Sequence, residues 1–136
     1  MRVLLVEPDY YTRYPPLGLL KLSAYHKARG DEVHLVRGCQ PAPWTPDRIC
    51  ITSLFTYAWE PVHRAIMYFR AHHPFVRIQV GGVYASLFPQ RVEACGAEAV
   101  KGTSPELDSL RPDYSLVPHW PASILFASRG CIRACP

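Results

Sequence analysis

Strand patterns and helix patterns alternate along most of this chain, and this alternation limits the folds that the chain can adopt. Apolar runs rich in valine, leucine and isoleucine predict strands over residues 2–6, 32–37, 48–54, 76–82 and 97–102. Helical periodicity lies between most of these runs, over residues 15–30, 57–73 and 83–96. Strands joined by helices form right-handed βαβ units and lie parallel in one sheet. We therefore expect an α/β fold, a doubly wound Rossmann-like or flavodoxin-like parallel sheet of about five strands flanked by helices.

The pattern changes after Gly102. Residues 103–121 hold four prolines and show no helix or strand period, which is typical of a connecting segment. The apolar run in residues 122–130 then predicts another strand. We expect an α/β domain over residues 1–104, a linker over 105–122 and the beginning of a second domain over 123–136.

Charge and hydropathy exclude several classes of partner. The formal net charge of +4 is modest and the basic residues are scattered along the chain, so we expect no nucleic acid partner. No segment approaches the roughly 20 apolar residues of a membrane-spanning helix, so we expect no membrane partner. The five cysteines are odd in number and irregularly spaced, unlike a secreted disulfide framework. These features predict a cytoplasmic protein.

Small and aromatic residues follow several of the predicted strands. In open α/β sheets, ligands bind beyond the carboxyl ends of the strands. Gly81 and Gly82 leave backbone accessible there, and Thr52 and Ser53 offer hydroxyl groups. Aromatic residues gather at the same edge, at Tyr10, Tyr11, Tyr14, Phe55, Tyr57 and Trp59. This edge suits a large planar ligand, or else a tight turn whose aromatic side chains pack on a neighbouring domain. A G-x-G-x-x-G dinucleotide motif is absent.

Two of these segments resemble the cobalamin-binding domain, whose pattern is D-x-H-x-x-G, then S-x-L, then G-G. Here Thr52-Ser53-Leu54 stands in place of S-x-L, and residues 55–80 separate it from Gly81-Gly82. Asp9 matches the aspartate, but Tyr11 replaces the histidine and Tyr14 the glycine. The resemblance implies a cofactor edge formed by Asp9, Tyr11, Thr52, Ser53, Leu54, Gly81 and Gly82. Any bound cobalamin would then lack a histidine as lower ligand.

The segment "SRGCIRACP" (128–136) resembles the start of the radical S-adenosylmethionine signature C-x-x-x-C-x-x-C. Thiolates are suitable iron ligands, and the resemblance implies that Cys131 and Cys135 bind a [4Fe–4S] cluster together with a third cysteine. That cysteine would belong to a C-terminal radical S-adenosylmethionine barrel. We therefore expect the chain to be a fragment that is inactive alone, with the cluster and S-adenosylmethionine bound only by the full-length enzyme. The remaining cysteines, Cys39, Cys50 and Cys95, are expected as small buried apolar residues.

Two other hypotheses remain open from the residues. In one, the chain is a degenerate Rossmann-like module for interaction or substrate gating that binds no cofactor, which the tyrosines at 11 and 14 favour. In the other, it is a free-standing receiver-like or flavodoxin-like protein. A receiver needs a phosphoacceptor aspartate after the third strand, where this chain has Thr52-Ser53-Leu54.

Overall fold

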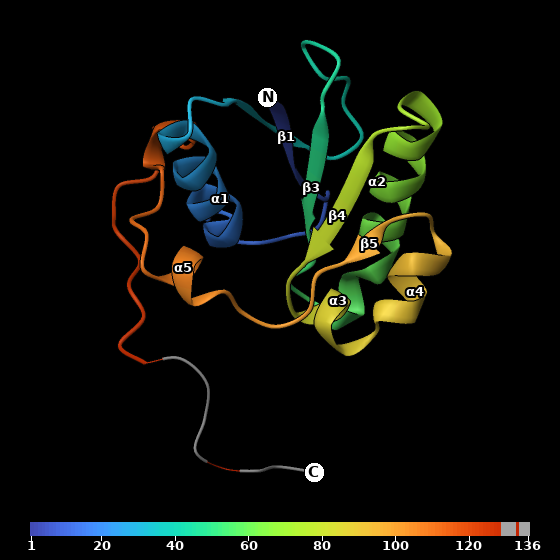
Figure 1. Ribbon diagram of the computed structural model, residues 1–136. Coiled ribbons are helices and arrows are strands. Elements are labelled where there is room, and N and C mark those ends of the chain that lie inside the picture. The colour runs from blue at the N-terminus through green and yellow to red at the C-terminus, as the bar shows by residue number, and fades with distance from the viewer. Residues whose placement is uncertain (129–132, 134–136) are drawn as a thin grey trace.

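The computed structural model describes residues 1–128 and 133, and its centre is a five-stranded, all-parallel sheet (Figure 1). The strands are β1 (Arg2–Glu7), β2 (Glu32–Arg37), β3 (Arg48–Thr52), β4 (Arg77–Gly81) and β5 (Glu98–Ala99). Their order across the sheet is β2-β1-β3-β4-β5, which is the order of flavodoxin-like folds. The predicted α/β fold is therefore confirmed.

Helices connect the strands on both sides of the sheet. They are α1 (Leu17–Ala28), α2 (Trp59–His72), α3 (Val83–Leu87), α4 (Pro89–Ala94) and α5 (Pro105–Asp108), with 3₁₀ turns at Thr56–Ala58 and Tyr114–Leu116. Figure 1 shows α1 and α5 on one side of the sheet and α2, α3 and α4 on the other. The segment 83–96 forms two short helices instead of one, and the second begins at Pro89, because proline suits the first position of a helix. No helix within the described residues is long and apolar enough to cross a membrane.

The two faces of the sheet carry separate apolar clusters. Leu4, Val6, Ile49 and Ile51 pack against α2, whose residues Val62, Ala65, Ile66 and Phe69 are all buried at the spacing predicted from the sequence. Val3, Leu5 and Cys50 face the other way and pack against Leu19 of α1. Both faces of β1 are covered, which explains its continuous apolar run.

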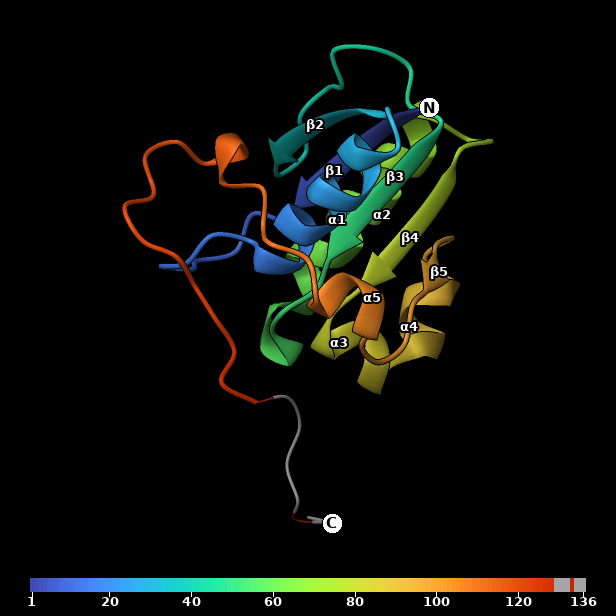
Figure 2. The ribbon, with the colours of Figure 1, turned by 60° about the vertical axis from the view of Figure 1, so that its left-hand side comes forward.

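The segment expected as a linker packs along α1. The carboxylate of Asp113 accepts hydrogen bonds from the Ser23 hydroxyl at 2.7 Å and pairs with the Lys27 ammonium at 2.7 Å. The Asp113 N–H also donates to the Leu20 carbonyl at 3.0 Å, and Val117 is buried. In both Figure 1 and Figure 2 the orange segment after α5 lies beside α1. Residues 113–117 therefore add to the layer that covers this face of the sheet.

Three strand predictions need correction. The strand predicted over 122–130 is wrong for residues 122–128, which have no regular structure. A strand needs a neighbouring strand for its backbone hydrogen bonds, and within the described residues this segment pairs with none. The third strand ends at Thr52, and the Ser53 carbonyl beyond it accepts a hydrogen bond from the Tyr84 N–H of α3. The fifth is shorter than predicted, because only Glu98 and Ala99 pair with β4.

Candidate functional site

Ser53 and Gly82 hold two loops together at the carboxyl ends of β3 and β4. The Ser53 hydroxyl donates to the Gly81 carbonyl at 2.7 Å and accepts from the Ala85 N–H at 3.1 Å. The Ser53 carbonyl accepts from the Tyr84 N–H at 3.0 Å, and Ser53 is fully buried. Gly82 has φ of +105°, and a Cβ there would lie 2.6 Å from the Ser53 carbonyl oxygen. The serine and the second glycine of the motif therefore form a tight internal junction.

Thr52 and Gly81 lie side by side at the ends of the same two strands. They are direct partners in the β3–β4 register, so the spacing noted in the sequence brings them together. A Cβ at Gly81 would meet no atom within 4 Å, in contrast to Gly82. The first glycine therefore leaves open space beside the sheet where another molecule can approach the backbone.

Tyr10 fills the position between β1 and β3 at which the strand order reverses. Its side chain is buried, and its ring packs edge-on against Phe55 at 5.5 Å. Burial raises the pKa of the Tyr10 phenol to about 12, and the nearby Glu7 carboxylate adds to this, against hydrogen bonds with Leu54 and Thr52. The phenol is therefore neutral at ordinary pH. In folds of this type the reversal point is the usual ligand crevice, and here a side chain of the protein occupies it.

The remaining motif residues project into solvent. The Asp9 side chain is 82% exposed and lies 3.7 Å from the Arg37 guanidinium. Tyr11 is 83% exposed, and Leu54 is 46% exposed. The fold thus brings together Thr52, Ser53, Gly81 and Gly82 as predicted, whereas Asp9 and Tyr11 point away from them.

The cysteines divide into two groups. Cys131 and Cys135 lie outside the described residues. Cys50 is buried as predicted, and burial raises the pKa of its thiol to about 11, which makes it a poor metal ligand at neutral pH. Cys39 is exposed because it lies in the loop after β2, so the burial predicted for it is wrong. Cys95 is half-buried, so the burial predicted for it is confirmed only in part. Among the described residues, no group of three or more histidine, cysteine or acidic side chains could hold a metal ion.

Large apolar side chains are exposed along the edge where β1, β3 and β4 end. We call this edge the apolar rim, and it consists of Tyr11, Tyr14, Leu54, Tyr57, Trp59, Val83, Leu87 and Phe88. Phe55 and Tyr57 stack at 5.1 Å with nearly parallel rings. Several large apolar side chains exposed at one edge of a sheet are typical of an interaction site. The sequence predicted the aromatic part of this rim from the residues that follow each strand.

A cavity of about 350 Å³ lies next to the apolar rim, beyond the ends of β1 and β2. Glu7 is buried in its wall and accepts a long hydrogen bond from the Arg37 guanidinium at 3.4 Å. Burial raises the pKa of the Glu7 carboxyl, although Arg37 opposes the shift. The segment 116–120 forms the opposite wall. The only sequence signal for this cavity was an acidic residue at the end of a buried strand, because its other wall comes from a distant part of the chain.

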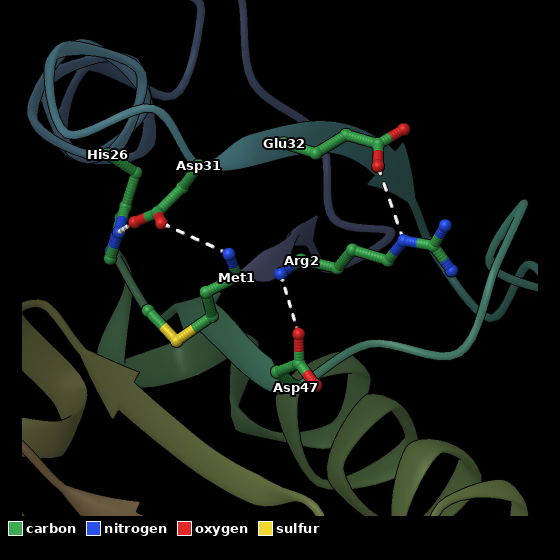
Figure 3. Close-up of polar contacts among 6 residues, drawn as sticks. All are labelled: Met1, Arg2, His26, Asp31, Glu32 and Asp47. Atoms are coloured by element: carbon green, nitrogen blue, oxygen red, sulfur yellow. Dashed lines mark hydrogen bonds and ion pairs between the residues drawn. The ribbon is translucent and has the colours of Figure 1, made fainter.

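A larger hollow of about 560 Å³ lies at the opposite edge, where the strands begin. Its charged groups are already paired with one another (Figure 3). The Arg2 guanidinium pairs with Glu32 at 3.2 Å, and the Arg2 N–H donates to the Asp47 carboxylate at 2.7 Å. Asp31 lies between the amino group of Met1, at 3.3 Å, and the His26 imidazole, at 2.8 Å. These pairs hold the first strands and α1 together, and we assign them to the fold.

A scan against protein-family models gives no match for this chain, and a search of the curated proteins gives none either. The geometry at the carboxyl ends of the strands and the sequence motifs are therefore the basis for a functional assignment.

Proposed function

We propose that this chain is a cobalamin-binding-type accessory domain of a radical S-adenosylmethionine enzyme, catalytically incomplete by itself. The observation that carries the proposal is the apolar rim at the ends of the strands, which is the edge where a doubly wound domain meets its ligand. An isolated soluble domain gains nothing from exposing Tyr11, Tyr57 and Leu87 to water. A catalytic barrel seated on this rim would bury them.

The iron–sulfur part of the proposal rests on the C-x-x-x-C segment. Cys131 and Cys135 would supply two of the three thiolates of a [4Fe–4S] cluster, and the third would come from the barrel. Such a cluster supplies the electron that breaks a carbon–sulfur bond of S-adenosylmethionine. The described residues would contribute to this enzyme a docking surface and a wall of the substrate space.

The residues that resemble the cobalamin motif fit a cobalamin only in part. Gly81, the register partner of Thr52, leaves open space beside the sheet, which suits a bulky ligand. Tyr11 replaces the histidine, and a phenol is a poor ligand for cobalt. Ser53 has no exposed hydrogen-bonding capacity, since its hydroxyl is bonded to Gly81 and Ala85. A cobalamin held through a histidine of the protein therefore does not fit this chain.

A second candidate function follows from the same contacts. If Tyr10 stays in the crevice between β1 and β3, the domain keeps the fold and serves as an interaction or substrate-gating module without a cofactor. The burial of Tyr10 and its contact with Phe55 favour this alternative.

Titration of the purified chain with hydroxocobalamin, followed by visible absorption, distinguishes the two candidates. Binding to the sheet face predicts a spectral change that saturates at one cobalamin per chain. Gly81→Leu should abolish this change, because its side chain would fill the open space. Glu93→Leu adds the same side chain to the exposed face of α4 and should leave the titration unchanged. An unchanged cobalamin spectrum with the parent chain would overturn the cofactor part of the proposal and support the second candidate.

A further inference from the structure

Two helices on one side of the sheet bring a tyrosine and a histidine into direct contact. Tyr84 belongs to α3 and His63 to α2, and both helices lie on the same side of the sheet (Figure 1). The Tyr84 hydroxyl and Nε2 of His63 are 2.8 Å apart. The Tyr84 N–H donates to the Ser53 carbonyl at 3.0 Å, which anchors this tyrosine to the end of β3. The hydrogen bond between the two side chains therefore joins parts of the fold that are firmly held.

The surroundings of this pair set the direction of the hydrogen bond. Burial lowers the pKa of the His63 imidazole below its usual 6.5, and the Arg91 guanidinium adds to this. The imidazole is therefore neutral at neutral pH. We assign its one proton to Nδ1, which leaves Nε2 to accept a hydrogen bond from the Tyr84 hydroxyl. The phenol thus has a neutral base within reach of its proton.

A short series of rings connects Tyr84 to the surface. Tyr84 itself is fully buried and packs against Phe88, with ring centroids 5.6 Å apart. The centroid of the His63 ring lies 5.7 Å from that of Tyr84 and 5.2 Å from that of Trp59. Trp59 is 42% exposed and belongs to the apolar rim. The three rings therefore lead from the rim to a tyrosine that solvent does not reach.

Among aromatic side chains, indole and phenol lose a single electron most readily, and a phenol loses it more easily when a neighbouring base accepts its proton. We propose that Tyr84 is a redox site, which gives one electron to oxidised Trp59 while its proton passes to Nε2 of His63. Neither cobalamin nor an iron–sulfur cluster takes part in this step. The inference therefore goes beyond the proposed function and does not depend on it.

The proposed transfer balances in electrons and protons. A one-electron oxidant, either an organic radical or a high-potential metal complex, reaches the exposed part of Trp59 and removes one electron from the indole. The Tyr84 phenol returns one electron to the indole radical cation, its O–H bond breaks, and the proton bonds to Nε2 of His63. The products are the original Trp59, a neutral phenoxyl radical at Tyr84 and an imidazolium at His63. An oxidised phenol is a far stronger acid than imidazolium, so the proton transfer is favourable although burial and Arg91 disfavour the cation.

A second tyrosine and histidine, both in α2, provide a matched comparison. The centroids of the Tyr68 and His72 rings are 4.2 Å apart, which is closer than those of Tyr84 and His63. However, Nδ1 of His72 donates to the Tyr68 carbonyl at 2.8 Å. Tyr68 therefore has an imidazole beside its ring but, within the described residues, no base bonded to its hydroxyl. Tyr68→Phe and His72→Gln are the controls for Tyr84→Phe and His63→Gln.

Flash photolysis of the chain with tris(bipyridine)ruthenium(II) and a cobalt(III) ammine as electron acceptor supplies the one-electron oxidant. Electron paramagnetic resonance after rapid freezing detects the radical. We expect a tyrosyl radical that outlives those of exposed tyrosines, because buried Tyr84 cannot meet a second radical in solution. Tyr84→Phe should abolish this long-lived signal, and Tyr68→Phe should retain it. Absence of the signal in the parent chain, or its persistence in Tyr84→Phe, would overturn the proposal.

The rate of radical formation tests the proton acceptor. Glutamine can accept a hydrogen bond but is a much weaker base than imidazole, so His63→Gln should slow the formation of the Tyr84 radical about tenfold or more. His72→Gln should leave the rate unchanged. Formation in the parent chain should also be slower in D₂O than in water. The same rate in His63→Gln and in the parent chain would rule out His63 as the acceptor.

The route of the electron is tested at the surface. Trp59→Phe should slow radical formation several-fold, whereas Trp44→Phe, at the opposite edge beside Arg2, should not. Equal slowing in the two variants would contradict entry through Trp59. Because Tyr84 is buried, its variant is first checked for folding by circular dichroism. His63 and Trp59 are partly exposed, and their variants test the proposal independently of that result.

Discussion

Gly82 lies so close to Ser53 that a single added methyl group at Gly82 would come within 2.6 Å of the Ser53 carbonyl oxygen. The backbone at Gly82 also has φ of +105° and ψ of −175°, a conformation that is essentially restricted to glycine. The junction between β3 and α3 therefore depends on glycine at this position for both steric and conformational reasons.

Gly82→Ala should lower the free energy of unfolding by about 2–4 kcal/mol, from backbone strain and displacement of the Ser53 carbonyl. Gly81→Ala is the matched control, because its Cβ enters open space, and its effect should stay within about 0.5 kcal/mol. Urea unfolding followed by circular dichroism measures both. Equal effects at the two glycines would contradict the junction described here.

Arg70 connects α2 to two loops through backbone carbonyls. Its guanidinium donates to the carbonyls of Gly96 at 2.6 Å, Val76 at 2.8 Å and Pro74 at 3.0 Å. Arg70→Lys retains the charge but cannot reach three acceptors at once. We expect a loss of about 1–3 kcal/mol in thermal unfolding experiments. Arg64→Lys on the same helix is the control, and a loss as large at Arg64 would show that Arg70 has no special role.

The lowered pKa of Asp113 predicts that the folded chain loses stability in acid. Burial raises its pKa, but hydrogen bonds from Lys27, Ser115 and Ser23 outweigh this and bring the pKa to about 2, below the usual 3.8. A lowered pKa in the folded state gives stability that is complete above about pH 4 and is lost as the pH falls toward 2. The free energy of unfolding, measured with urea at pH 6 and at pH 3, should change by about 1–2 kcal/mol less in Asp113→Asn than in the parent chain.

Glu93→Gln, an exposed acid on α4, serves as the control for Asp113. The raised pKa of Glu7 acts in the opposite direction, since its protonated form is favoured by folding and its contribution is lost as the pH rises through that raised pKa. If Asp113→Asn lost as much stability between pH 6 and pH 3 as the parent chain, other carboxyl groups would be responsible for the loss in acid.

The apolar rim predicts self-association when nothing covers it. We expect the chain to form dimers or larger species at high concentration in sedimentation velocity experiments. Tyr57→Ser and Leu87→Ser should reduce this association, because their side chains are 77% and 62% exposed on the rim. Phe75→Ser is the control, because Phe75 is 99% exposed but precedes β4 at the opposite edge. If only Phe75→Ser reduced association, the rim would not be the contact surface.

Iron reconstitution tests the C-x-x-x-C segment. A [4Fe–4S] cluster of the proposed type needs at least three protein ligands, and Cys131 and Cys135 would supply two. The other thiols lie in different elements, and that of Cys50 is buried with a pKa of about 11. Anaerobic reconstitution should therefore give less than one cluster per chain by iron analysis and visible absorption. A stoichiometric cluster spectrum would contradict this prediction.

The sheet was predictable because its signals are local. Each strand is an apolar run, and the buried positions of α2 follow the helical period. The contacts of Tyr10 with Phe55 and of Asp113 with Ser23 join residues far apart in sequence. Such contacts could not be predicted, because no local sequence pattern indicates them. The strand predicted after residue 121 failed for a related reason, because an apolar run forms a strand only when a partner strand is present.

The carboxylate of Asp113 ties the end of the α/β unit to α1, the first helix of the chain. A pulling force applied to the chain after residue 117 would therefore act on α1 and the centre of the sheet instead of on β5. The two-residue outer strand is thereby shielded from being peeled away, although its own hydrogen bonds are too few to resist a pull.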